Sequence, residues 1–125
     1  TLAHLHYWSV QLTREASRDE VLDAFRTSSR IALIRISDGL SAINSVKELM
    51  ADLGRPHDSL YEVALWEDML KVQGNELFYA YMVDNQAIVV PETIDAIRAL
   101  TGAEPDAETS IRDTNDSLGI GSLGL

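Results

Sequence analysis

The fold is decided by residues 61–83, which read YEVALWEDMLKVQGNELFYAYMV. Two runs in this stretch, Tyr61–Trp66 and Leu77–Val83, are rich in the aromatic and β-branched side chains that favour β-strands. Between them lies the polar segment Gln73-Gly74-Asn75, whose residues are typical of a tight turn. We therefore predict two strands joined as a hairpin.

Two more strands are predicted upstream of this hairpin. Ile31 to Ile36 is a short β-branched run, which predicts a buried strand that ends at the turn Ser37-Asp38-Gly39. His4 to Leu12 is rich in aromatic and apolar residues and predicts the other strand. Because side chains alternate along a strand, one face of it would carry His4, His6, Trp8, Val10 and Leu12.

Two helices are predicted between these strands. Ser17 and Glu20 have the spacing of a capping box and predict a helix from about Arg18 to Thr27. Its stripe would consist of Val21, Ala24, Phe25 and Ser28. The second helix is indicated by apolar residues at helical spacing, with Gly54 at the position of a left-handed C-cap and Pro56 preventing continuation. These apolar residues are Ile43, Val46, Leu49, Met50 and Leu53.

The last third of the chain predicts two further helices. Pro91 suits a first helical position, Gly102 ends the element, and Asp106 suits the N-cap of the last helix. The stripe of the first helix would be Ile94, Ile97 and Leu100, and that of the last helix Ala107, Ile111, Thr114 and Leu118. The last stripe is narrow. We therefore expect the last helix to dock on a body outside these residues.

The order of elements indicates the fold class. Strand, helix, strand, helix, hairpin, helix and helix follow one another with no internal repeat and no linker. This pattern predicts an α+β layer sandwich, in which helices cover a mixed or antiparallel sheet. With 125 residues, 46% of them hydrophobic, the chain has the size and balance of one domain with its own core, spanning residues 1–125.

Composition excludes several classes of function. The chain contains no cysteine, so it holds no disulfide framework, no thiolate metal site and no cysteine nucleophile of its own. Its net charge of -10 argues against nucleic-acid binding, which needs clustered basic residues. No apolar run approaches the roughly 20 residues of a membrane span, and residues 1–20 lack the order of a signal peptide. We expect a cytoplasmic protein that does not act at a membrane.

The basic residues of the chain are mostly arginines. Lys47 and Lys71 are the only lysines, against eight arginines and 20 carboxylates. An acidic surface poor in lysine suggests a protein kept soluble in concentrated salt, where self-repulsion is screened within roughly 3 Å at 1 M. The alternative is an ordinary acidic protein from a GC-rich genome.

Two small groups of residues could take part in catalysis or ligand binding. His4 and His6 would point the same way from one strand, roughly 7 Å apart, and such a pair suits a base with a helper or two metal ligands. As a metal site the pattern is weak, because His57 is the only other histidine, and a structural role is the alternative for both. Asn85 and Gln86 follow a strand end, where amide side chains suit a ligand amide or sugar but are also ordinary turn formers.

Four stretches together resemble the archaeal, or type II, glyceraldehyde-3-phosphate dehydrogenases. They are residues 1–6 (TLAHLH), 60–66 (LYEVALW), 90–99 (VPETIDAIRA) and 114–120 (TNDSLGI). The resemblance covers nearly the whole chain. It implies the C-terminal part of the catalytic domain of a two-domain enzyme, whose Rossmann domain binds NAD or NADP and whose nucleophilic cysteine lies in another segment.

The resemblance also implies roles for individual residues. His4 or His6 would be the base that serves the cysteine, and spacing does not distinguish them. The family usually reads His-Gln-Glu-Ser where this chain has Asp84-Asn85-Gln86-Ala87, so Asn85 takes the position of a glutamine near the nicotinamide, and Gln86 adjoins it. The implied substrates are glyceraldehyde 3-phosphate and phosphate, in glycolysis or gluconeogenesis.

For the whole enzyme the resemblance implies a larger assembly. The C-terminal helix would pack on the nucleotide-binding domain, and the full-length protein would be a homotetramer. Aromatic residues would serve either at a subunit interface or in the core, namely Trp8, Trp66, Tyr79 and Tyr81. The fragment alone would be inactive. The competing hypothesis is a stand-alone, non-catalytic α+β module for binding or oligomerisation.

Overall fold

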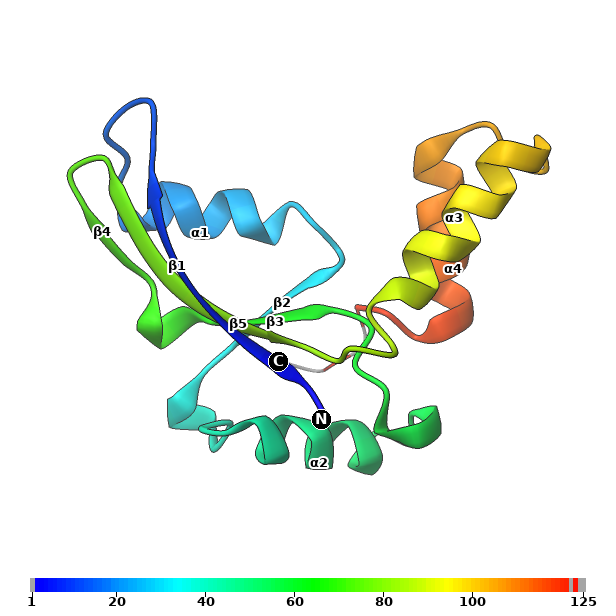
Figure 1. Ribbon diagram of the computed structural model, residues 1–125, viewed down its shortest axis with the longest axis horizontal. Helices are drawn as coiled ribbons and strands as arrows, with labels where there is room; N and C mark the ends of the chain where they lie inside the picture. Colours follow the sequence, from blue (N-terminus) through cyan, green and yellow to red (C-terminus); the bar gives the residue numbers. More distant parts are fainter. Residues whose placement is uncertain (1, 122, 124–125) are drawn as a thin grey trace.

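The computed structural model describes residues 2–121 and 123, so Thr1 of the first motif lies outside the described residues (Figure 1). The described strands are β1 (His4–Gln11), β2 (Ile31–Ile34), β3 (Val63–Trp66), β4 (Lys71–Gln73) and β5 (Glu76–Val83). The described α-helices are α1 (Arg18–Arg26), α2 (Ile43–Asp52), α3 (Val89–Thr101) and α4 (Ala107–Leu118). Short 3₁₀ turns lie at Ile36–Asp38, Pro56–Asp58 and Glu67–Met69.

The strands form one mixed sheet in the order β1-β5-β3-β2, and β4 adds to it by pairing with β5. Only β2 and β3 run parallel among the described pairs, and the connection between them contains α2. β5 is the central strand and pairs antiparallel with β1 over eight residues, from His4 opposite Val83 to Gln11 opposite Glu76. The predicted α+β class with a mixed sheet is confirmed.

Helices lie on both faces of the sheet (Figure 1). On one face α1 contributes Val21 and Leu22 to an apolar cluster with Leu65 and Leu77 of the sheet. On the opposite face α2 contributes Val46 and Met50 to a second cluster, packed on alternate residues of the same strands, which include Ala64, Trp66, Ala80 and Met82. Period-two alternation in β3 and β5 therefore supplies both cores.

The predicted helix starts were largely confirmed. Ser17 accepts a hydrogen bond from the backbone N–H of Glu20, whose carboxylate accepts one from the N–H of Ser17, so the predicted capping box is present. The predicted stripe of α1 was partly wrong, because Leu22 is buried in place of Ala24, which is exposed. Asp106 caps α4 through the N–H of Thr109, as predicted.

Two strand predictions need correction. The run Ile31 to Ile36 forms a strand only as far as Ile34, and it is half-buried for most of its length because β2 is the edge of the sheet. Ile36 instead begins a 3₁₀ turn and is exposed. The predicted hairpin turn is present, since Gly74 has a φ of 65°, but it joins β5 to the short strand β4 rather than to the strand containing Trp66.

The prediction for α3 was wrong in two respects. The helix begins at Val89, so Pro91 is its third residue, which is tolerated because the first four N–H groups of a helix have no intrahelical partner. Its predicted apolar stripe is not a packed face, since Ile97 is 55% and Leu100 86% exposed. The residues of α3 that face α4 are polar instead, and they include Asp95 and Arg98.

The predicted stripe of α4 is divided. Thr114 is buried and Leu118 is partly buried, whereas Ala107 and Ile111 are exposed. The α3–α4 pair stands beside the sheet rather than over either face of it (Figure 1). The large apolar residues of the pair that the described chain leaves exposed are Val89, Ile97, Leu100 and Ile111.

Candidate functional site

The two histidines of β1 lie on one face of the sheet, as their spacing predicts. Their ring centroids are 6.2 Å apart in an edge-on arrangement. His4 is exposed and His6 is half-buried. This face is the one that α1 covers, but α1 packs near Leu77 and Tyr79, whereas His4 pairs with Val83 at the far end of β5. Among the described residues no helix covers this end of the face, so His4 is accessible to a reactant and His6 is partly accessible.

His6 belongs to a row of aromatic rings that fixes its orientation. Its ring stacks on Tyr81 at a centroid distance of 4.9 Å and an interplanar angle of 10°. Tyr81 in turn stacks on Tyr79, and Tyr79 contacts Phe25 of α1. Burial, with a smaller contribution from Tyr81, raises the pKa of the Tyr79 hydroxyl, so that phenol stays neutral. The row connects His6 to the packed core.

The predicted interface aromatics have different roles in the chain. Trp66 is 4% exposed and donates a hydrogen bond from Nε1 to the carbonyl of Leu40, so it is a core residue. Trp8 is half exposed and donates from Nε1 to the hydroxyl of Tyr81 at 3.1 Å. Trp8 therefore steadies the ring on which His6 stacks. Tyr79 and Tyr81 are half-buried and lie on the sheet face that carries His6 and Trp8.

The amide segment lies at the same end of the sheet as His4. β5 ends at Val83, the partner of His4, and Asp84, Asn85 and Gln86 follow directly. The side-chain oxygen Oδ1 of Asn85 is buried and has no hydrogen-bond partner among the described residues. An unpaired buried acceptor is rare in native proteins and is often explained by a ligand or an ordered water. Gln86 is exposed.

Asp84 shapes this segment. One carboxylate oxygen accepts hydrogen bonds from the backbone N–H groups of Gln86 and Ala87 at 3.0 and 3.1 Å. The other accepts from Nζ of Lys47 at 2.7 Å. Desolvation by itself would raise the pKa of this carboxyl, but the hydrogen bonds from Lys47, Ala87 and Gln86 outweigh it and hold the pKa below its usual range. Asp84 is therefore ionised at neutral pH.

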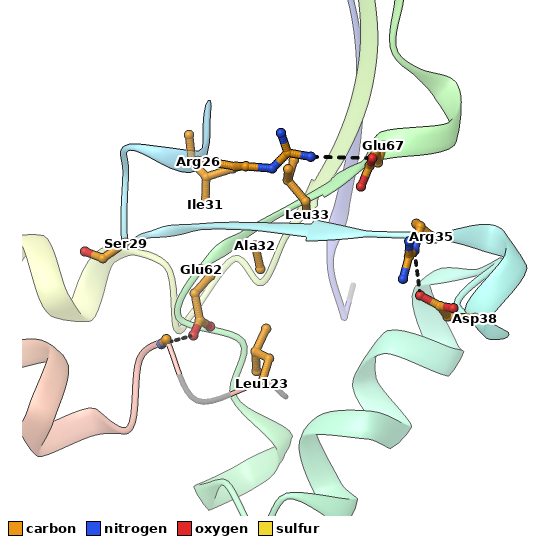
Figure 2. A pocket seen from close by; sticks show the side chains of 11 residues that line it. Arg26, Ser29, Ile31, Ala32, Leu33, Arg35, Asp38, Glu62, Glu67 and Leu123 are labelled. Carbon is orange, nitrogen blue, oxygen red and sulfur yellow. Dashed lines mark hydrogen bonds and ion pairs between the residues drawn. The ribbon is translucent and has the colours of Figure 1, made fainter. Parts of the chain in front are cut away.

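A separate cavity of about 440 Å³ lies beside β2, at the sheet edge opposite β1 (Figure 2). Figure 2 shows Arg26 reaching toward Glu67 on one side of β2, with Glu62 and Leu123 on the other. The two arginines that line the cavity are paired with carboxylates: Arg26 with Glu67 at 3.7 Å, and Arg35 with Asp38 at 2.9 Å. Because these cations are already neutralised, the cavity offers a ligand fewer available polar groups than the histidine face does.

Sequence reasoning missed Lys47 and this cavity. Lys47 is one of two lysines, but nothing local indicates a partner 37 positions away at Asp84. In the described part of the chain no three His, Asp or Glu side chains are grouped so as to hold a metal ion. His57 lies apart on a 3₁₀ turn, with a φ of 53°. None of the helices in residues 2–121 could span a bilayer.

Comparison with known proteins identifies similar chains. The sequence is 41% identical over 96% of its length to the glyceraldehyde-3-phosphate dehydrogenase of Methanobrevibacter smithii, and it covers 36% of that protein. It is likewise 41% identical over 96% of its length to the enzyme of that name from Methanopyrus kandleri, covering 34% of it, and 40% identical over 97% to that of Metallosphaera sedula, covering 35%. No family model matches the chain.

These relatives carry the name of the family that the four sequence motifs resemble. The chain spans about a third of the length of each, so the similarity concerns one part of those proteins. The aligned region spans 96–97% of this chain.

Proposed function

We propose that this chain is part of a phosphorylating, NAD(P)-dependent glyceraldehyde-3-phosphate dehydrogenase, and forms the C-terminal part of its catalytic domain. The observation that carries the proposal is the identity of about 40% to proteins of that name over almost the whole chain. The geometry supports it, because the two imidazoles lie together on one sheet face, and the amide segment follows the strand end that pairs with His4.

In this proposal one imidazole of the pair acts as the base. It removes the proton from a cysteine thiol supplied by another segment of the protein, and the thiolate attacks the aldehyde carbon. The imidazolium returns this proton to the oxyanion that forms, which gives a hemithioacetal and a neutral imidazole. The same imidazole then takes the hydroxyl proton while a hydride leaves the carbon, which produces a thioester. Phosphate attacks the thioester, and the products are the acyl phosphate and the free thiol.

The nicotinamide cofactor supplies the hydride acceptor. Asn85 fits this group in chemistry, because its Oδ1, which has no partner in the part of the chain that the structure describes, can accept a hydrogen bond from the carboxamide N–H of a nicotinamide. Gln86 adjoins it and is exposed, so its amide is free to reach the same ligand. The role of the described residues is to bind and orient the nicotinamide; the choice between NAD and NADP depends on groups near the ribose.

The uncovered apolar surfaces support the assembly included in the proposal. Ile97 and Leu100 of α3 and Ile111 of α4 present an apolar surface, as expected if the helical pair packs on a nucleotide-binding domain. Leu5 and Tyr7 on β1 are also exposed, and suit a sheet face buried between subunits of a homotetramer. The acidic, lysine-poor composition supports an enzyme adapted to concentrated salt, and we propose that this enzyme acts in the cytoplasm.

The test is a comparison of three histidine variants of the complete protein encoded by the gene. His4→Ala and His6→Ala are assayed for phosphate-dependent reduction of NAD or NADP by glyceraldehyde 3-phosphate, and His57→Ala is the matched control. Loss of the base should lower kcat by about 10² to 10⁴, and loss of the other histidine of the pair should lower it less. His57→Ala should leave kcat unchanged. The proposal is refuted if both β1 variants keep the kcat of the control.

A further inference from the structure

Lys47 is fixed between two elements that border the amide segment. It projects from α2 and donates hydrogen bonds from Nζ to the carbonyl of Asp58 and to the carboxylate of Asp84. Its side chain is 12% exposed, and that of Asp84 is 8% exposed. An ion pair so shielded from solvent is geometrically fixed, unlike a typical surface pair. It therefore connects α2 rigidly to the end of β5.

The carboxylate of Asp84 divides its two oxygens between structural tasks. Oδ1 accepts from the N–H groups of Gln86 and Ala87, which bends the chain into a turn ahead of α3. Oδ2 accepts from Lys47 and lies 3.5 Å from the N–H of Leu60. Without Lys47, Oδ2 would keep only the long contact with the N–H of Leu60, and the carboxylate would hold the turn less firmly.

Asn85 lies inside this turn and is held on both sides. Val83 before it is paired in the sheet, and Ala87 after it is buried in a small apolar cluster with Tyr61 and Ile120. The backbone of Asn85 thus has little freedom, and its side-chain oxygen is buried without a partner among the described residues. Leaving such an acceptor unpaired carries a desolvation penalty, so a turn that keeps it unpaired favours a ligand that supplies the donor.

We propose that Lys47 and Asp84 are positioning residues that hold the Asn85 amide oxygen ready to accept a hydrogen bond from the carboxamide of a nicotinamide dinucleotide. The inference rests on the proposed function and adds to it two residues that do not touch the cofactor. Lys47 acts on cofactor affinity through the turn, and Asn85 makes the contact.

The test uses the complete protein and titrates it with NAD and NADP in a calorimeter. Lys47→Met removes the ammonium group and keeps the length of the chain, Lys47→Arg keeps the charge, and Lys71→Met is the matched control at the exposed second lysine. One lost hydrogen bond of about 1.4 kcal/mol corresponds to a tenfold change in Kd. Lys47→Met should therefore raise the Kd and KM of the dinucleotide about tenfold, with the KM of the aldehyde unchanged.

Two further variants separate positioning from general destabilisation. Lys47→Arg should restore the Kd to within about threefold of the wild type, and Lys71→Met should leave it unchanged. Asn85→Ala should raise the Kd by about the same tenfold factor, and the double variant Lys47→Met with Asn85→Ala should be no worse than either single variant, because both remove the same contact.

Any of three outcomes would overturn the inference. The first is a Kd of Lys47→Met equal to that of Lys71→Met, and the second is a Kd that Lys47→Arg fails to restore. The third is a double variant in which the effects of Lys47→Met and Asn85→Ala add. In each case the wild type still binds the dinucleotide, and the proposed function stands. A wild-type protein that neither binds nor reduces the dinucleotide refutes the proposed function and this inference with it.

Discussion

The buried pair of Arg55 and Glu62 offers a sharp test of how the chain is held together. The two side chains are 6% and 1% exposed, and they meet through two parallel hydrogen bonds of 2.6 and 2.7 Å. The pair also fixes the segment after α4, since Arg55 donates to the carbonyl of Gly119 and Glu62 accepts from the N–H of Gly121. It therefore joins the residues that precede β3 to Gly119 and Gly121, which follow α4.

The expected magnitudes follow from burial. Removing one partner leaves an uncompensated buried charge, so Arg55→Met and Glu62→Leu should each lower the free energy of unfolding by about 3 to 5 kcal/mol. The double variant leaves no buried charge. It loses the bonds to Ser59, Gly119 and Gly121, each worth about 1 kcal/mol, and should therefore be about 3 kcal/mol less stable than the wild type. The loss in the double variant should thus be far smaller than the sum of the two single losses.

Urea unfolding, followed by the fluorescence of Trp66, measures these free energies, because this indole is buried and becomes solvated on unfolding. In thermal unfolding, each kcal/mol corresponds to roughly 3 to 5 °C for a chain of this size. The exposed pair of Arg35 and Asp38 provides the control, and Arg35→Met should cost less than about 1 kcal/mol. The reasoning is refuted if the single effects of Arg55→Met and Glu62→Leu simply add.

Three further predictions concern stability. Asp95→Asn should lower the free energy of unfolding at pH 7 by about 1.5 to 3 kcal/mol. Although burial alone would raise the pKa of Asp95, hydrogen bonds from Ser110, Thr114 and Arg30 hold it below its usual range. The difference in the free energy of unfolding between the wild type and Asp95→Asn should therefore be complete above the unfolded-state pKa of about 3.9, and it should vanish as the pH falls through the folded-state pKa. Urea unfolding at several pH values measures this difference, and equal differences at all pH values would contradict the prediction. Ser17→Ala should cost about 1 kcal/mol in thermal unfolding through loss of the N-cap, and an unchanged midpoint would contradict it. Met82→Ala should cost about 2 to 5 kcal/mol in urea unfolding, because Met82 is fully buried, and a loss below about 1 kcal/mol would contradict it.

Local patterns sufficed to predict most elements of the fold. The capping box at Ser17 and the N-cap at Asp106 depend on neighbouring residues alone, and both form as expected. Period-two alternation likewise placed His4 and His6 on one face. The edge position of β2 was not predictable in this way, because an apolar run does not reveal which strand lies beside it. The run beginning at Ile31 was consequently expected to be fully buried.

The candidate site divides in the same way. The histidine pair and the amide at Asn85 were found from their residue types and from resemblance. Their supporting contacts were not, because each depends on chain segments far apart in the sequence. Tyr81 stacks on His6 only because β5 pairs with β1 in that register, and Lys47 meets Asp84 only because α2 lies beside the end of β5. Long-range pairing thus determines how the site is held.

The pair α3 and α4 shows why a correct period can still indicate the wrong packing. The apolar residues of α3 do recur at helical spacing, yet the two helices pack through Asp95, which accepts hydrogen bonds from Ser110 and Thr114. Arg30, beside β2, completes this polar contact by pairing with Asp95 at 2.6 Å. Since charged and hydroxyl side chains fill the contact between the helices, the apolar stripe that ends at Leu100 is left facing outward. An exposed stripe of this kind is costly unless another body covers it, and this supports our proposal that the helical pair docks on a nucleotide-binding domain.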